Sequence, residues 1–134
     1  MDELDISFFE RTCMLIAAYA HDNGHEGLNN NFYINNNLDL ALKYSYISPL
    51  ENMHASNLMR LIAKYELPIP LEQKKMMVSM ILGTDMTHHL GMIEELSKNI
   101  NKYKGKVVNK KDRQFLMNVA IHAADLNNAT KPTK

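Results

Sequence analysis

The apolar residues of this sequence recur at helical intervals between clear chain breakers, and this pattern limits the possible folds most. Close to the N-terminus, positions three or four apart are apolar, namely Ile6, Phe9, Cys13, Ile16, Ala17 and Ala20. This spacing predicts one buried face of a helix over residues 5–22, which must end where Asn23 and Gly24 interrupt it. No stretch alternates β-branched and polar residues, so the sequence predicts an all-α fold.

Further helices follow breaks that are rich in Asn, Gly or Pro. Residues 29–37 are Asn-rich and are interpreted as a connection, before a short helix over 38–44 with Asn37 as its N-cap. The segment Ser48-Pro49-Leu50-Glu51 is a stronger start signal, because it combines a Ser cap, a Pro at the first helical position and a Glu that completes a capping box. That helix should extend to about Tyr65.

The second half of the chain predicts two more helices. One long helix covers residues 71–99, a polar and basic loop covers 102–109, and a last helix runs from 110 to 126. The expected architecture is therefore a helical bundle of about five helices. The 134 residues, with a mass of 15.4 kDa, suit one small domain and contain no internal repeat.

Charge and cysteine content exclude several classes of protein. Lys and Arg total 15, as do Asp and Glu, and this zero net charge does not favour nucleic-acid binding. The single cysteine, Cys13, excludes a disulfide framework and zinc sites built on several thiolates. No apolar run approaches the roughly 18 residues that cross a bilayer, and the acidic start is unlike a secretory signal. We therefore expect a cytoplasmic protein with no membrane segment in this chain, although a longer parent protein could be membrane-associated.

The densest cluster of chemically useful side chains is His21-Asp22-x-x-His25, at the point where the first helix breaks. Imidazole and carboxylate groups are ligands for zinc, and carboxylates also suit magnesium or manganese. The metalloprotease pattern does not fit, because Asp22 stands in place of its Glu and Gly24 interrupts the helix. The alternative for an isolated pair is a solvated helix end, where the helix dipole favours His.

Polar residues interrupt the apolar faces of three other predicted helices. Glu51 and His54 share one helix face, Thr84-Asp85 ends the apolar run 76–82, and Asp125 follows an apolar stretch of the last helix. Each has an ordinary structural explanation: a capping box for Glu51, a bond back to its own helix for Thr84, solvent exposure for the neighbouring His88 and His89, and a polar helix end for Asp125. Together, however, they could converge on one metal site, as helical bundles allow.

Five blocks of residues, spread over nearly the whole chain, resemble the catalytic domain of the class I 3′,5′-cyclic nucleotide phosphodiesterases, a branch of the HD-type metal phosphohydrolases. The blocks are His21-Asp22-x-x-His25-x-Gly27-x-x-Asn30-x-Phe32, Leu40-Ala41-Leu42-x-Tyr44, Ser48-x-Leu50-Glu51-Asn52-x-His54, Thr84-Asp85-Met86-Thr87-x-His89 and His122-x-Ala124-Asp125-Leu126-x-Asn128-x-Thr130-Lys131-Pro132. The resemblance implies the central part of that all-α fold. It also implies hydrolysis of cyclic AMP, cyclic GMP or both to 5′-nucleoside monophosphates in cyclic nucleotide signalling.

The resemblance further implies two divalent metals, Zn²⁺ and Mg²⁺ (or Mn²⁺), and a role for each matching residue. His21, Asp22 and Asp125 match metal ligands, with Asp22 bridging to the second metal. In the family, other residues orient the water at the metals, and these are matched here by His25, Glu51 and Thr84. Positions beside the nucleotide pocket are matched by Met86, Leu126 and Asn128.

The sequence departs from the family pattern in several places. Four substitutions are mild, since they remove no metal ligand: Glu26, Met53, Gly83 and Ala129. No His precedes His21, and neither the family's upstream general-acid and metal His segment nor its downstream base-binding segment is matched. We therefore expect residues 1–134 to be a partial catalytic domain, inactive or very weak alone, whose partner is the remainder of that domain or a homologous chain. The alternatives are a truncated, non-catalytic interaction or regulatory module and another HD-type metal phosphohydrolase.

Overall fold

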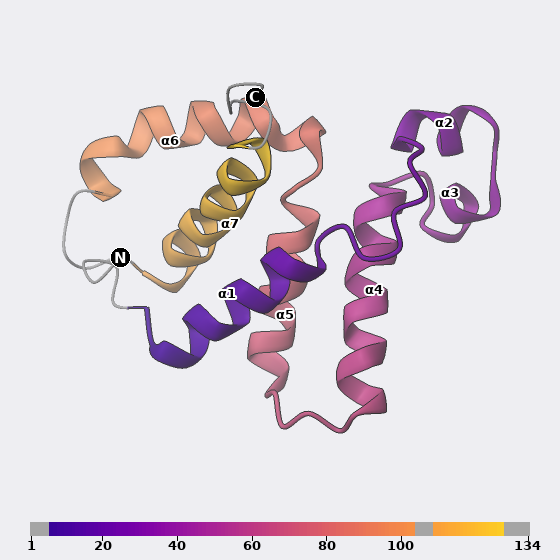
Figure 1. Ribbon diagram of the computed structural model, residues 1–134. Coiled ribbons are helices and arrows are strands. Elements are labelled where there is room, and N and C mark those ends of the chain that lie inside the picture. The colour runs from indigo at the N-terminus through magenta and orange to yellow at the C-terminus, as the bar shows by residue number, and fades with distance from the viewer. Residues whose placement is uncertain (1–5, 104–108, 128–134) are drawn as a thin grey trace, which may run out of the picture.

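The computed structural model describes residues 6–103 and 109–127, which form helices without any strand among them (Figure 1). The elements are α1 (Phe8–Ala20), α2 (Asn30–Asn35), α3 (Asp39–Lys43), α4 (Pro49–Lys64), α5 (Leu71–Leu82), the 3₁₀ turn η2 (Met86–His88), α6 (His89–Tyr103) and α7 (Lys110–Leu126). The all-α prediction is confirmed, and the last helix has the bounds expected from the sequence. None of the helices in the described ranges is long and apolar enough to cross a membrane.

Helix α5 lies at the centre of the core, with α1, α4 and α7 packed around it (Figure 1). Its side chains Met77, Met80 and Ile81 are fully buried, and burial of each contributes roughly 1.5–3 kcal/mol. Small residues of α1, Cys13 and Ala17, are also fully buried, which lets the α1 backbone approach α5 closely. The predicted apolar face of α1 is thus confirmed, except that the Phe9 side chain is 42% exposed.

Helix α1 begins at a capping box that sequence inspection missed. The Ser7 Oγ accepts a hydrogen bond from the Glu10 N–H, and the Glu10 carboxylate accepts one from the Ser7 N–H. The helix ends at Ala20, and Gly24 adopts a φ of +89°, which only glycine adopts readily. His21 and Asp22 therefore stand at the rim of a buried helix, as the sequence predicted.

The Asn-rich region contains a helix where the sequence predicted a connection. Helix α2 begins there because the Asn29 side chain accepts a hydrogen bond from the Phe32 N–H at 2.9 Å. The predicted cap of the next helix is also wrong, since Leu38 precedes α3 and Asn37 lies in a left-handed conformation at a φ of 50°. A second, smaller core joins α2, α3 and α4 through Tyr33, Ala41 and Leu50.

Helix α4 begins at Pro49 as predicted, but its predicted capping box does not form. Ser48 has a left-handed backbone, at φ 41° and ψ 56°, and its side chain makes no capping bond. The Ser48 hydroxyl instead donates to the Asp85 carboxylate at 2.6 Å. A hydrogen bond to the distant, buried Asp85 carboxylate thus replaces the predicted capping bond. The Glu51 carboxylate is therefore available for a different partner.

The predicted long helix over 71–99 is wrong, because the chain breaks at residues 83–88 into α5 and α6. The Thr84 hydroxyl donates back to the Ile81 carbonyl at 2.7 Å, and the Asp85 carboxylate accepts from the Thr87 N–H at 2.8 Å. Such short side chains compete with helical hydrogen bonds and end the helix here. Helix α6 then runs alongside α7 (Figure 1), since His89 at its start contacts His122 and Lys102 near its end pairs with Asp112.

The basic stretch predicted as a solvated loop is partly helical. Helix α6 continues to Tyr103, and residues 104–108 lie outside the described part of the chain. In and beside this stretch, three described lysines form ion pairs with carboxylates: Lys98 with Glu94, Lys102 with Asp112, and Lys110 with Glu72. These pairs reduce the positive charge that this surface offers to an anionic partner.

Candidate metal centre

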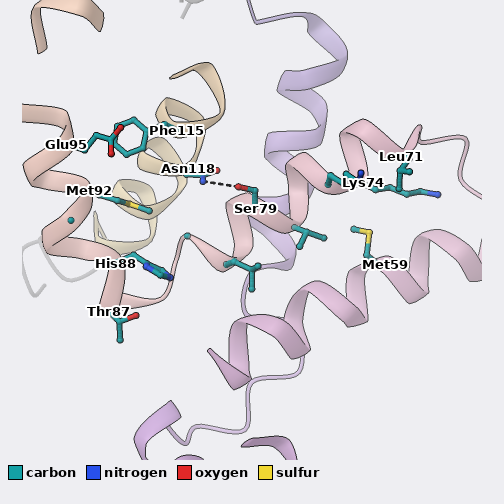
Figure 2. A pocket seen from close by; sticks show the side chains of 15 residues that line it. Met59, Leu71, Lys74, Ser79, Thr87, His88, Met92, Glu95, Phe115 and Asn118 are labelled. Carbon is teal, nitrogen blue, oxygen red and sulfur yellow. Dashed lines mark hydrogen bonds between the residues drawn. The ribbon is translucent and has the colours of Figure 1, made fainter. Parts of the chain in front are cut away.

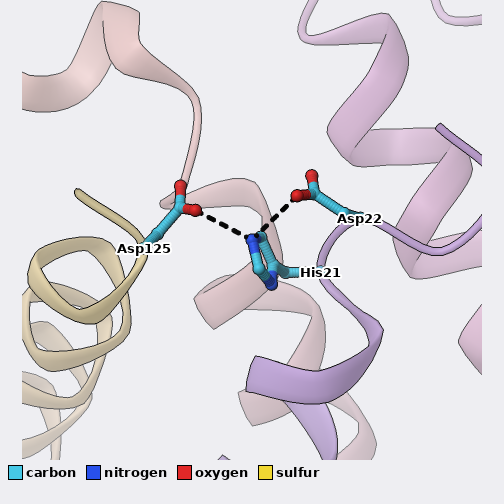
Figure 3. A group of neighbouring side chains, drawn as sticks. All are labelled: His21, Asp22 and Asp125. Atoms are coloured by element: carbon cyan, nitrogen blue, oxygen red, sulfur yellow. Dashed lines mark hydrogen bonds and ion pairs between the residues drawn. The ribbon is translucent and has the colours of Figure 1, made fainter. Parts of the chain in front are cut away.

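All three predicted metal ligands meet where the end of α1 approaches the last turn of α7 (Figure 3). The His21 Nε2 lies 3.0 Å from an Asp125 Oδ1 and 3.2 Å from an Asp22 Oδ2. Asp125 is 104 residues away from His21 in the sequence, so this contact depends on the packing of α1 and α7 against α5. All three ligand atoms lie within 4.8 Å of one another.

The proton arrangement of His21 favours a cation at this point. Its Nδ1 donates to the Ala18 carbonyl at 2.7 Å, which leaves the lone pair of Nε2 directed at two carboxylate oxygens. Those negative atoms repel a lone pair, so either a proton on Nε2 or a metal ion relieves the repulsion. Burial lowers the pKa of His21, but the Ala18 carbonyl and the two carboxylates outweigh it and raise this pKa overall. A metal-binding His commonly has its second nitrogen bound to a carbonyl, and the donor set therefore fits Zn²⁺, Mg²⁺ or Mn²⁺.

A cavity of about 330 Å³ brings most of the predicted site residues together. Six of the nine line it: Asp22, His25, Glu51, Thr84, Met86 and Asp125. A seventh, His21, contacts two of these through its Nε2. The structure thus supports the prediction that polar interruptions on separate helices converge on one site.

Glu51 faces this cavity from α4 and is held there by an asparagine of α2. The Asn30 Nδ2 donates to the Glu51 carboxylate at 2.8 Å, while its Oδ1 accepts from the Leu50 N–H at 2.9 Å. Burial raises the pKa of Glu51, the Asn30 bond opposes this rise, and the nearby Asp85 and Asp22 charges add to it. A cation in the cavity would relieve this repulsion between carboxylates, which is a second reason to expect one there.

Two histidines that line the cavity lie close together, His25 in the connection after α1 and His54 on α4. The exposed His25 accepts the Gly27 N–H at its Nδ1, so the proton of its neutral ring lies on Nε2. His54 of α4 is only 2% exposed, and its ring centroid lies 5.8 Å from that of His25. Burial lowers the pKa of His54, which keeps this ring neutral near pH 7.

The residues predicted beside a nucleotide pocket are less closely grouped. Met86 is 55% exposed at the rim of the 330 Å³ cavity. Leu126 is half-buried at the end of α7 and is not among the residues that line that cavity. Asn128 lies outside the described residues. The roles of all three in nucleotide binding stay predictions.

Sequence reasoning quoted several cavity residues without giving them roles. Asn30 could not be assigned locally, because its partners lie 20 and 21 residues away. For His54, the position on the same helix face as Glu51 indicated a place near the site. For Asp85, the interruption of an apolar run did so. The bond of Asp85 to Ser48 spans 37 residues and had no local signal.

A second and larger cavity, about 980 Å³, lies between α5, α6 and α7 (Figure 2). Its lining is mostly apolar and includes Val78, Met92 and Phe115. Figure 2 also shows the Asn118 side chain donating to Ser79 Oγ at the cavity wall, at 3.1 Å. This cavity holds no cluster of acids and histidines, so chemistry rather than size identifies the smaller one as the candidate site. Thr87 lines both cavities.

The helical fold and the His–Asp–Asp centre define an all-α protein with a candidate site for divalent metals. The sequence profile of the 3′5′-cyclic nucleotide phosphodiesterase family matches residues 4–134, and the protein belongs to that family. The resemblance of the five sequence blocks is thereby confirmed.

Individual relatives agree with this assignment. The chain is 32% identical over 127 residues to the 3′,5′-cyclic-nucleotide phosphodiesterase regA of Dictyostelium discoideum, covering 89% of this chain and 16% of that protein. It is 34% identical over 132 residues to isoform F of the 3′,5′-cyclic-AMP phosphodiesterase of Drosophila melanogaster, covering 88% of this chain and 20% of that protein. The crystal structure of the phosphodiesterase domain of the RhoPDE fusion protein from Salpingoeca rosetta superimposes with a TM-score of 0.83 at 32% identity. That match covers 95% of this chain and 43% of the solved one. The chain thus spans a minor part of each of these relatives.

Proposed function

We propose that this chain provides the metal-binding centre of an enzyme that hydrolyses 3′,5′-cyclic nucleotides to 5′-nucleoside monophosphates. The observation that carries the proposal is the His21 lone pair facing Asp22 and Asp125, in a chain of the phosphodiesterase family. Cyclic AMP is the first substrate to test, because Drosophila relatives are named cyclic-AMP phosphodiesterases. Cyclic GMP is the second.

The proposed resident metals are a Zn²⁺ ion held by His21, Asp22 and Asp125, and a Mg²⁺ or Mn²⁺ ion that shares Asp22. When bound, the two ions supply Lewis acidity and neutralise the charge of a phosphodiester. The chain's part is to concentrate negative charge around them. Two of its ligands are partly screened from water, since the side chains of His21 and Asp125 are only 19% and 33% exposed.

The surrounding side chains are proposed to orient water and substrate in the 330 Å³ cavity. Asn30 fixes Glu51, so that the remaining carboxylate lone pairs of Glu51 can accept hydrogen bonds from water. The Thr84 hydroxyl donates its hydrogen bond to the Ile81 carbonyl, so the hydroxyl oxygen can accept a hydrogen bond from water. His25 has its Nε2 proton available as a donor. The apolar Met86 at the rim is proposed to contact the nucleotide together with Leu126 and Asn128.

Metal binding by the 134-residue chain provides the direct test. We expect Mn²⁺ and Zn²⁺ titrations, followed by calorimetry, to show binding that weakens at least tenfold in Asp125→Asn. Asp39→Asn is the matched control, since Asp39 is exposed on α3 and should leave affinity unchanged. Equal affinity of Asp125→Asn and the wild type would contradict the proposed centre.

Hydrolysis is then measured as the 5′-AMP released from cyclic AMP by the metal-loaded chain. We expect slow turnover that disappears in Asp22→Asn and persists in Asp39→Asn. Turnover that survives Asp22→Asn would contradict the proposal. A last experiment adds the part of a relative's catalytic domain that this sequence does not match. Faster turnover in this mixture would support the prediction that the remainder of such a domain is the partner.

A further inference from the structure

Two histidines join the start of α6 to α7 beside the candidate site. The Nδ1 of His89, the first residue of α6, lies 3.0 Å from the Nε2 of His122 on α7. The ring centroids are 5.2 Å apart, and His122 is only 4% exposed. The sequence-based expectation that His89 is simply solvated is therefore wrong.

The surroundings of His122 keep its ring neutral. Burial lowers its pKa, and the neighbouring His89 lowers it further, so the ring is neutral near pH 7. In the hydrogen bond between the two rings, one of the two nitrogens, His89 Nδ1 or His122 Nε2, carries the proton and the other accepts it.

The pair is placed where it can control the geometry of the candidate site. His122 lies one turn before Asp125 on α7, and His89 is the second residue after the segment 84–87, whose residues line the 330 Å³ cavity. This segment is not α-helical, so its position depends on how its two ends are held. Asp85 fixes one end to α4 through the Ser48 hydroxyl, and His89 fixes the other to α7.

The contact between His89 and His122 is important because a second cavity adjoins the segment 84–87. Thr87 and His88 also line the 980 Å³ cavity, which extends under α6 (Figure 2). At the far end of α6, Lys102 pairs with Asp112, and this ion pair does not restrain residues 84–87. Without the histidine pair, the segment would have room to move into the larger cavity.

We propose that the His89–His122 hydrogen bond is a positioning contact that keeps the segment 84–87 against α7, so that Thr84 and Asp125 face one metal site. The part that concerns metal binding rests on the proposed function, whereas the positioning of the segment does not. His89 and His122 touch neither substrate nor metal in this scheme. They act through Thr84 and Asp125.

The test compares variants of His89 with a matched variant of its neighbour. His89→Leu keeps the bulk but removes the hydrogen-bonding nitrogen, whereas His89→Asn places an amide, which can donate or accept, close to the position of the imidazole Nδ1. His88→Leu applies the same change to an exposed histidine one residue away, outside the hydrogen bond. Circular dichroism confirms folding, and His89→Ala replaces His89→Leu if that variant does not fold.

The first readout is nuclear magnetic resonance without metal. We expect a ¹⁵N–¹⁵N coupling across the His89–His122 bond in the wild type. We also expect changed backbone amide shifts at residues 84–87 and at Asp125 in His89→Leu, which revert largely in His89→Asn. The inference is overturned if the coupling is absent at pH 8, or if His89→Leu changes these amides no more than His88→Leu does.

The second readout is the Mn²⁺ affinity of the same proteins. Partners of metal ligands typically alter affinity about 10-fold to 100-fold, and for this indirect contact we expect the lower limit, about tenfold weaker binding in His89→Leu. His89→Asn and His88→Leu should bind like the wild type. Undiminished affinity in His89→Leu overturns the link to the metal site. A wild type that binds no Mn²⁺ overturns the proposed function and that link together, while the metal-free shifts still decide the positioning.

Discussion

Removal of the Asp85 carboxylate should strongly destabilise the protein, although Asp85 lies in a short break between two helices. The side chain is 5% exposed and accepts two hydrogen bonds, from the Ser48 hydroxyl at 2.6 Å and from the Thr87 N–H at 2.8 Å. These bonds join α4, the end of α5 and the start of η2, so Asp85→Ala would release three elements around the candidate site.

The size of the effect follows from the two bonds. A hydrogen bond to a charged group stabilises a protein by about 1.5–3 kcal/mol. The lower value applies here, because Ser48 is half-buried and Thr87 is exposed, and water can replace part of each bond. Asp85→Ala should therefore lower the free energy of unfolding by about 3 kcal/mol, and Asp85→Asn by about half as much, since its amide oxygen can still accept from the Thr87 N–H.

Acid should have a related effect. Burial would raise the pKa of Asp85, but the Ser48 and Thr87 bonds outweigh burial and lower it. A lowered carboxyl pKa stabilises the folded state above the unfolded pKa, about 4, and this stabilisation is lost as the pH falls through the lower folded pKa. The wild type should thus lose part of its stability below about pH 4, and Asp85→Asn should lose less.

Urea unfolding followed by circular dichroism at 222 nm measures these differences. Glu94→Ala is the control, because Glu94 forms an exposed ion pair with Lys98 and should contribute about 0.5 kcal/mol or less. The reasoning would be refuted if Asp85→Ala cost no more than Glu94→Ala. It would also be refuted if the acid sensitivity of Asp85→Asn equalled that of the wild type.

Two further predictions concern the core and the histidine pair. Ile81→Ala on α5 should lower the free energy of unfolding by about 2–5 kcal/mol, because its side chain is fully buried in the main core, and the same urea titration measures this. Burial, reinforced by His89, lowers the pKa of His122, so the stability that His122 provides is present above about pH 6.5 and is lost as the pH falls below it. Thermal unfolding at pH 7.5 and pH 5.5 should therefore show a smaller acid loss in His122→Gln than in the wild type. An equal loss would contradict this assignment.

Local sequence signals determined most of the helical framework. Pro49 marked the start of α4, and the predicted bounds of α7 match the structure, because periodicity, proline and helix caps act within a few residues. The break after α1 placed His21 and Asp22 together at a helix end for the same local reason. The family resemblance, which drew on spaced blocks rather than on one element, indicated which distant groups belong with them.

Contacts between distant residues were decided only by the tertiary structure. Asp125 meets His21 across 104 positions because α1 and α7 both pack on α5. The Ser48 hydroxyl bonds the Asp85 carboxylate instead of capping α4. The same Asp85 carboxylate accepts the Thr87 N–H and so helps to divide the predicted long helix into α5 and α6. Asn30 supports Glu51 from another helix, and His89 meets His122 across 33 positions. Each of these bonds competes with a local alternative, and the geometry of helix packing, which no short stretch of sequence contains, determines which one forms.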